Sequence, residues 1–168
     1  MRAVLVLVIG VAMVAAGAFW WLTRGDVPAN AVAASPGVTM STPMGQSKDP
    51  NDPGEKMFRR GLYPEALSYW VNEAAKGRAQ AAHRLGVEYQ DGKPGVAQRD
   101  YVRALKYHMQ AAMAGNPLSM FDLGSMHEGG LGVEKSLAEA ARWYGHSARY
   151  GLAQGQYNFA TMLERGDG

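Results

Sequence analysis

Two residue patterns recur along the chain with the same spacing, 36 to 38 positions. Leu85-Gly86 returns as Leu123-Gly124 after 38 positions and as Phe159-Ala160 after a further 36. An alanine–aromatic pattern alternates with these segments at the same two offsets, as Ala66 and Tyr69, Ala104 and Tyr107, and Ala140 and Trp143. Two interleaved series with one period indicate a unit of two elements that is used several times. Stacked units of this kind bury a continuous core that no single unit buries alone.

Both elements have the residue spacing of an α-helix. One helical face is formed by residues at i, i+3, i+4, i+7 and i+8, namely Ala104, Tyr107, His108, Ala111 and Ala112. Small residues stand where helices would cross, as Gly86, Gly124 and Ala160. The periodicity predicts helices over 55–60, 64–76, 78–90, 100–113, 117–128, 136–149 and 153–164.

Signals at the predicted helix ends agree with this assignment. Gly77, Gly115 and Gly151 stand where a left-handed C-terminal cap needs a residue without a Cβ, and Gly92, Gly130 and Gly166 end the segments of the other series. Asn116 precedes Pro117 as an N-cap, and Asp100 can cap its own helix. Ser136 and Glu139 have the spacing of a capping box.

The stretch LGSMHEGGLGVEKSLAEAARWYGHSARYG, at 123–151, resembles the Sel-one-like repeat, a relative of the tetratricopeptide repeat. Residues 85–115 fit the same pattern with an enlarged loop, and 155–166 match the first helix of a further unit. The resemblance implies an all-α fold, a short solenoid of antiparallel helix pairs over 55–168 with about three repeats, the last incomplete. The last helix is then expected to expose a face, which a partner covers unless the chain is short or truncated.

The first 24 residues are expected to form a signal-anchor transmembrane helix. Residues 3–22 carry no charge, and about twenty helical residues span the roughly 30 Å hydrocarbon core of a bilayer. Trp20 and Trp21 stand at the far end, where aromatic rings favour the membrane interface. Arg2 and the α-amine favour a cytoplasmic N-terminus and an exported domain. A cleaved signal peptide is the alternative, because Ala16-Gly17-Ala18 has the small-x-small pattern of a cleavage site.

Residues 25–54 are predicted to be a disordered linker between this anchor and the repeat domain. The segment holds five prolines and lacks aromatic residues, Leu and Ile. It therefore has too little apolar surface to offset the entropy of ordering. The expected location is a single-pass membrane protein with its repeat domain exported, which is periplasmic in a bacterium.

Nothing in the sequence predicts catalysis, a metal site or a cofactor. The absence of cysteine excludes a thiol nucleophile and a thiolate zinc site. None of the four histidines forms a HxxxH or HExxH pattern, and no GxSxG elbow occurs. His108 occupies an aromatic position of the repeat, which favours packing, and His127-Glu128 is interpreted as a helix end rather than a metal or acid–base site. A formal charge of +2 gives no reason to expect nucleic acid as a partner.

Solenoids of short helical hairpins present a concave surface, lined mainly by the first helix of each pair. Positions next to the core stripe of these helices are the predicted binding residues, Arg84, Glu88, Asp122, Met126, Asn158 and Met162. Their mixture of charge, amide and thioether suits a protein or peptide. The resemblance implies an adaptor or regulator in cell-envelope assembly or signalling that binds another protein. The alternative is a periplasmic protein that binds or hydrolyses cell-wall peptidoglycan.

Overall fold

The computed structural model describes residues 49, 51–92 and 95–167, and this part of the chain is all-α. The predicted transmembrane helix and the first part of the predicted linker, up to residue 48, lie outside the described residues. Within the described ranges, no helix combines the length and the hydropathy needed to cross a membrane.

The described helices follow the predicted order. A short first helix, α3 (Pro53–Arg59), is followed by six helices of 13 residues each. These six are α4 (Tyr63–Ala75), α5 (Ala79–Asp91), α6 (Tyr101–Met113), α7 (Pro117–Gly129), α8 (Leu137–Arg149) and α9 (Ala153–Arg165). Each predicted helix is therefore present, with ends that differ by no more than two residues.

The first helix starts earlier than predicted. It begins at Pro53, two residues before the predicted start at 55, and the Asp52 side chain caps it by accepting from the backbone N–H of Glu55 at 2.9 Å. The same Asp52 oxygen accepts a hydrogen bond from Trp70 Nε1 at 3.0 Å. Residues 52–54, which the sequence analysis placed in the linker, therefore belong to the helical part of the chain.

The capping signals are confirmed, with one correction. Asp100 accepts from Arg103 N and Asn116 from Ser119 N, and the three predicted cap glycines have positive φ angles, between 82° and 86°. Gly92, Gly130 and Gly166, which end the other segments, also have positive φ angles, between 63° and 71°. Ser136 accepts from Glu139 N, but the reciprocal half of the predicted capping box is not formed. The Glu139 carboxylate instead pairs with Arg142 at 2.8 Å, and Ser136 N donates to the carbonyl of His127.

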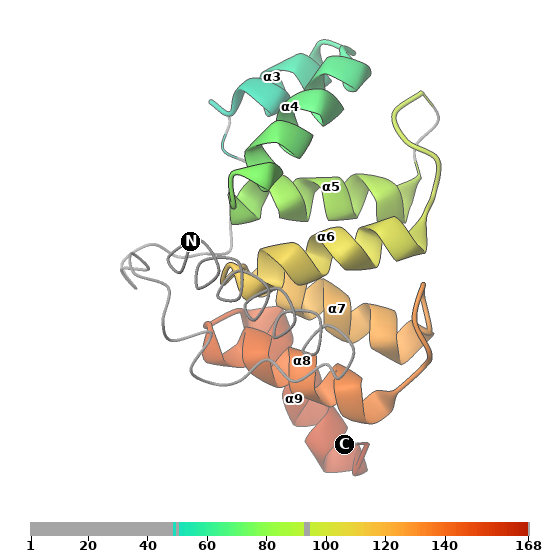
Figure 1. Cartoon of the computed structure of the whole chain (residues 1–168). Coiled ribbons are helices and arrows are strands. Elements are labelled where there is room, and N and C mark those ends of the chain that lie inside the picture. Colours follow the sequence, from blue (N-terminus) through green and yellow to red (C-terminus); the bar gives the residue numbers. More distant parts are fainter. Residues whose placement is uncertain (1–48, 50, 93–94, 168) are drawn as a thin grey trace, which may run out of the picture. The chain divides into compact units, whose positions relative to one another are not determined.

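The helices stack in chain order, and each packs against the next (Figure 1). α5 also touches α7, so consecutive helix pairs are in direct contact, as in a repeat solenoid. Leu85 and Trp70 are buried in the cluster near α4 and α5, and Tyr144 and Met162 are buried in the cluster near α8 and α9. The predicted solenoid of paired helices is confirmed for the described part of the chain.

Two of the small residues predicted at crossings, Gly86 and Gly124, lie at close contacts. A Cβ at Gly86 would meet the His108 ring at 2.6 Å, and one at Gly124 would meet the Tyr144 ring at 2.6 Å. Glycine is required at both positions because the facing ring occupies the space of a side chain. Ala160 is exposed, so no described helix crosses α9 on that side.

Candidate functional site

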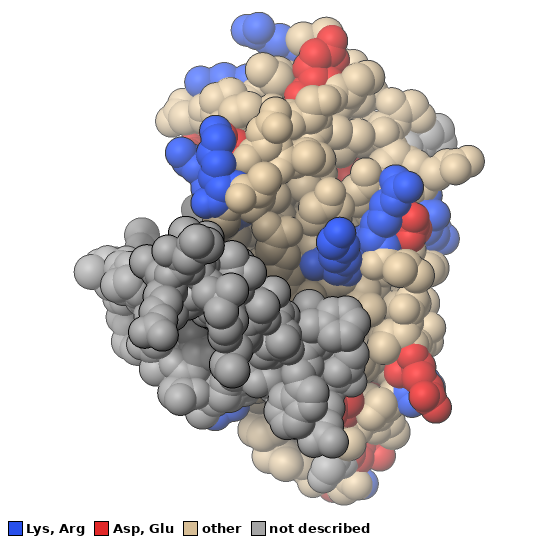
Figure 2. Space-filling model, in the orientation of Figure 1, with Lys and Arg blue, Asp and Glu red and all other residues tan. Residues whose placement is uncertain are grey.

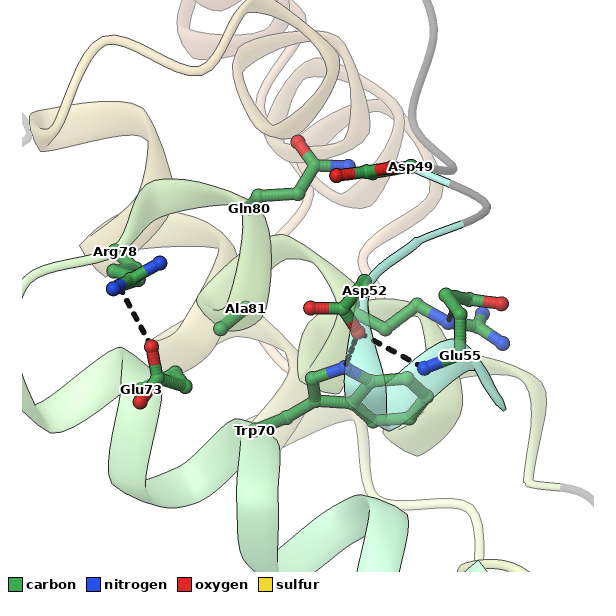
Figure 3. Close-up of a pocket in the computed structure, with 9 residues that line it drawn as sticks. Asp49, Asp52, Glu55, Trp70, Glu73, Arg78, Gln80 and Ala81 are labelled. Atoms are coloured by element: carbon green, nitrogen blue, oxygen red, sulfur yellow. Dashed lines mark hydrogen bonds and ion pairs between the residues drawn. The ribbon is translucent and has the colours of Figure 1, made fainter. Parts of the chain in front are cut away.

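A cavity of about 160 Å³ opens where α3, α4 and α5 meet (Figure 3). We call it the α3–α5 cavity. Trp70 forms one wall, and Gln80 lies beside Asp49 at the rim (Figure 3). The charged residues that line it are Asp49, Asp52, Glu55, Glu73, Arg78 and Arg84. Four carboxylates therefore face two guanidinium groups.

Two of these carboxylates are matched by the two arginines. Arg84 Nε lies 2.6 Å from Glu55 Oε1, and Arg78 Nε lies 2.6 Å from Glu73 Oε2. The hydrogen bond from Lys76 to Glu73, followed by the nearby charge of Arg78, holds the Glu73 pKa below its ordinary value. The donors that Asp52 meets, by contrast, are the neutral Trp70 ring and a backbone N–H (Figure 3). Asp49 accepts from the backbone N–H of Asn51.

The α3–α5 cavity therefore keeps an excess of negative charge. Tyr69 lies near it, and its pKa is raised first by burial and then by the charges of Asp52 and Glu73. A wall carrying this charge favours a cationic group from outside. The Trp70 ring adds an apolar surface on which the stem of a long basic side chain can lie.

Arg84 and Glu88, two of the predicted binding residues, form one buried ion-pair cluster with Glu55. Arg84 Nη1 lies 2.6 Å from Glu88 Oε1, in addition to the contact with Glu55. The guanidinium also lies over two aromatic rings, 4.7 Å from the centroid of Phe58 and 4.9 Å from that of Trp70. Glu88 is 0% exposed. The buried contacts of Arg84 thus connect α3, α4 and α5. Of the three charged residues in this cluster, Arg84 and Glu55 line the cavity and Glu88 does not.

Asp122, another predicted binding residue, belongs to a second polar cluster, which we call the histidine cluster: His83, His108, Ser119 and Asp122. Asp122 Oδ2 lies 3.4 Å from Nδ1 of His83 and 3.4 Å from Nδ1 of His108. Ser119 Oγ lies 3.0 Å and 3.4 Å from the same two nitrogens. The cluster joins α5, α6 and α7. Four polar atoms from three helices therefore converge on one point.

The surroundings of the histidine cluster shift its titration. Burial, and then the Arg84 charge, lowers the pKa of His83 to about 4. Burial, and then His83, lowers the pKa of His108 to about 3. Burial, and then the charge of Asp91, raises the pKa of Asp122 to about 7. Both imidazoles are therefore neutral at neutral pH.

The histidine cluster contains the residue types of a serine hydrolase triad but not its geometry. In a triad the serine and the carboxylate contact opposite nitrogens of one imidazole. Here Ser119 and Asp122 approach the same nitrogen, Nδ1, of His83. Ser119 is also 0% exposed, so its hydroxyl is closed to a substrate. The cluster therefore lacks the geometry in which an imidazole, oriented by the carboxylate, takes the proton of the serine hydroxyl.

The remaining predicted binding residues lie in a third environment. Met126 and Met162 are core residues, and Asn158 hydrogen-bonds to Tyr144. Arg84, Glu88, Met126 and Met162 are all buried, so the prediction that these positions line an open surface is corrected. For Arg84, Glu88 and Met126 the reason is that α5 and α7 pack against the helices before and after them, so positions beside the core stripe face a helix rather than solvent. Met162 is buried in the apolar cluster where α9 packs on α8.

Several residues of both clusters were missed from the sequence. His83 and Ser119 carry no local motif, and the carboxylates of the α3–α5 cavity lie on separate helices. One signal was available, since the repeat spacing places His83 38 positions before Phe121 and His108 36 positions before Tyr144. Two histidines therefore replace two aromatic residues at equivalent positions, which could have directed attention to them.

Charged side chains on the outer surface stand in small groups, some of which are ion pairs such as that of Arg103 with Asp100. On the face drawn in Figure 2, Lys and Arg side chains stand in several groups with uncharged surface between them. The described residues visible on this face show no continuous basic track of the kind that follows a phosphate backbone. Large apolar side chains are exposed on α9, where Tyr157 is 72% and Leu163 is 59% exposed, in keeping with the exposed face predicted for the last helix.

A family model named Sel1 repeat matches residues 79–116 and 117–152. These two segments contain α5 with α6 and α7 with α8. The matches coincide with the Sel-one-like repeats expected from the sequence.

The chain is also similar to parts of curated proteins and of solved structures. The chain is similar to the ERAD-associated E3 ubiquitin-protein ligase component HRD3A of Arabidopsis thaliana, with 36% identity over 85 residues, which is 51% of this chain and 12% of that protein. It is also similar to the chitin synthase regulator SKT5 of Saccharomyces cerevisiae, with 30% identity over 83 residues, which is 49% of this chain and 12% of that protein. The chain thus spans about an eighth of the length of these relatives.

Among solved structures, c5321, described as a protective antigen of uropathogenic Escherichia coli with an SLR fold, aligns with a TM-score of 0.59 and 37% identity. That alignment covers 62% of this chain and 22% of c5321. A Sel1 repeat protein from Oxalobacter formigenes aligns with a TM-score of 0.61 and 26% identity, covering 67% of this chain and 45% of that protein.

Proposed function

The chain is a Sel1 repeat protein, related to tetratricopeptide repeat proteins, and we propose that it acts as an interaction module that binds another protein. The observation that carries this proposal is the stack of two matched Sel1 repeats. Sel1 repeats form a scaffold for protein–protein interaction, and relatives that share them include a ligase component and an enzyme regulator. An adaptor or regulator fits this scaffold better than a hydrolase, because the Ser119 hydroxyl is closed to solvent.

The α3–α5 cavity is where we place the main contact with the partner. It is large enough for one side chain, and its excess of negative charge, from Asp49 and Asp52, favours a lysine or arginine. Trp70 lines the same cavity and supplies apolar contact for the stem of that side chain. We therefore expect the partner to be a protein with a lysine or arginine on its surface that enters the cavity.

We further propose that the repeat domain acts on the exported side of a membrane, in cell-envelope assembly or signalling. Support comes from the sequence of residues 3–22, which carries no charge and has the length of a membrane span. A reporter enzyme that is active only outside the cytoplasm, fused after Gly168, should be active. The same fusion should be inactive when an arginine pair replaces Val6 and Val8 within the apolar segment.

The protein-binding role is tested by affinity capture of the full chain from detergent-solubilised membranes. Asp49 is exposed, so Asp49→Lys reverses a charge at the cavity without burying it. Glu134→Lys makes the same charge change at an exposed loop position and serves as the control. We expect a stoichiometric protein to be captured by the wild type and the control and to be lost with Asp49→Lys. Capture of cell-wall fragments in place of a protein would contradict the proposal.

A further inference from the structure

Four separations among the polar atoms of the histidine cluster match those between the ligands of a metal ion, and the ligand atoms of His83, His108 and Asp122 all lie within 4.8 Å of one another. Asp122 Oδ2 lies 3.4 Å from both Nδ1 atoms, and Ser119 Oγ lies 3.0 Å and 3.4 Å from them. For a tetrahedral zinc ion bound at about 2.0–2.1 Å, ligand atoms lie about 3.3–3.4 Å apart. As hydrogen bonds, the separations of 3.4 Å are too long to be strong. We propose that His83, His108 and Asp122 bind one Zn²⁺ ion, with Ser119 or water as the fourth ligand.

Packing alone does not require these residues, because the next repeat interface holds others in their place. The helix offsets of 38 and 36 residues relate His83 to Phe121, His108 to Tyr144 and Asp122 to Asn158. Phe121 and Tyr144 are in ring contact at 5.4 Å, as His83 and His108 are at 5.7 Å. In this second interface Tyr144 covers Gly124 as His108 covers Gly86. The fold therefore accepts aromatic residues and an amide at these three positions.

Burying a histidine at position 108 costs folding free energy, and a purely structural role does not explain why a histidine stands there. His108 is 0% exposed, and its Nε2 has no hydrogen-bond partner within the described part of the chain. A buried polar atom without a partner is destabilising, whereas the apolar ring carbons of Tyr144 at the equivalent position carry no such cost. Metal ligation through Nδ1 leaves Nε2 without a partner, but the free energy of metal binding to the folded state would compensate the cost.

The two imidazoles and the carboxylate are a donor set that suits zinc, and they come from three helices. The side chain of Asp122 is 22% exposed, which gives an ion a path from solvent. A bound ion would tie α5 and α6 of one repeat to α7 of the next, so its expected role is to lock the angle between two repeats.

The test uses the untagged full chain, stripped of metal with a chelator and then dialysed against buffer containing zinc. Elemental analysis should find one zinc per chain, and competition with a chromophoric chelator should give its affinity. Cobalt(II) in place of zinc should give the intense visible absorption of a four-coordinate site. The melting temperature should rise when zinc is added, because zinc binds the folded state.

A matched variant comes from the chain itself. His83→Phe, His108→Tyr and Asp122→Asn together reproduce the second interface, so this triple variant should stay helical by circular dichroism and retain no zinc. His146→Gln, which changes a histidine outside the cluster, should retain one equivalent. If the triple variant does not fold, Asp122→Asn alone should weaken zinc binding at least about tenfold. The proposal would be overturned if the folded wild type bound no stoichiometric zinc. It would also be overturned if the triple variant, which lacks the three ligands, retained as much zinc as the wild type.

Discussion

Arg84 and Glu88 lie one turn apart on α5, and their charged groups meet at 2.6 Å with both side chains almost fully buried. The pair is part of the cluster that joins α5 to Glu55 of α3. A buried carboxylate that loses its partner keeps its desolvation cost without the compensating attraction. The connection between α3, α4 and α5 therefore depends on this arginine.

Arg84→Met is expected to destabilise the domain by about 3–5 kcal/mol, because two buried carboxylates, Glu55 and Glu88, then lose the charge of the arginine that pairs with both. Adding Glu88→Leu removes one of these buried carboxylates and should restore part of the loss. Chemical denaturation followed by circular dichroism measures both effects. If the double variant is as unstable as the sum of the two single variants, the pair does not act as a unit.

Asp52→Ala is expected to cost more than an ordinary loss of a helix cap. Asp52 caps α3 and also accepts from Trp70 Nε1 at 3.0 Å, so the change removes two hydrogen bonds at once. A cap alone contributes about 0.5–2 kcal/mol. Asp100→Ala on α6 removes a cap without a tryptophan contact and is the matched comparison. Equal losses of unfolding free energy in the two variants would contradict the double role of Asp52.

Gly124→Ala should destabilise the domain by about 1–3 kcal/mol through overpacking. The added Cβ would lie 2.6 Å from the ring of Tyr144, which is buried and hydrogen-bonded to Glu128. Gly129→Ala, in the last turn of the same helix, meets the side chain of Leu131 at 3.2 Å and should cost less, since that side chain can shift. Thermal melts of the two variants provide the measurement, and a more harmful Gly129→Ala would show that the crossing at Gly124 is looser than described.

Tyr144 should make the domain sensitive to alkaline pH. Burial, followed by the hydrogen bond to Glu128, raises the pKa of Tyr144 well above its ordinary value. The folded state therefore keeps a proton that the unfolded state releases above pH 10, and stability falls as pH rises through this range. The contribution is about 1.4 kcal/mol for each pH unit between the two pKa values. In Tyr144→Phe the free energy of unfolding should fall less between pH 10 and 11, by about this amount. If the free energy of unfolding falls equally steeply in the variant and the wild type, Tyr144 is not the source of the alkaline sensitivity.

The sequence was sufficient for the helices and insufficient for the sites. Local signals such as Gly92, Gly130 and Asn116 define helix ends, because a left-handed glycine or an N-cap acts within one turn. The error at Glu139 arose where two local partners compete, since Arg142 one turn later attracts the carboxylate away from Ser136.

The sites depend on which faces meet across the repeat, and no local pattern reports that. Glu55 and Arg84 are 29 positions apart, and His83 and His108 are 25 apart, yet each pair is in contact. The predicted binding residues were chosen as neighbours of the core stripe, and stacking on both sides of α5 and α7 buried three of the six, while Met162 is buried where α9 packs on α8. Periodicity identified the helical faces, whereas the contacts between faces required the three-dimensional arrangement.

The central claim is that the α3–α5 cavity receives a protein partner. A photo-crosslinking amino acid placed at Gln80, an exposed residue that lines the cavity, tests this most directly in the cells that produce the protein. The same group at Gln98, exposed in the loop between α5 and α6, is the control. The account predicts one discrete crosslinked protein from Gln80 that is absent from Gln98 and lost with Asp49→Lys. No crosslinked protein from Gln80, or the same products from both positions, would contradict it.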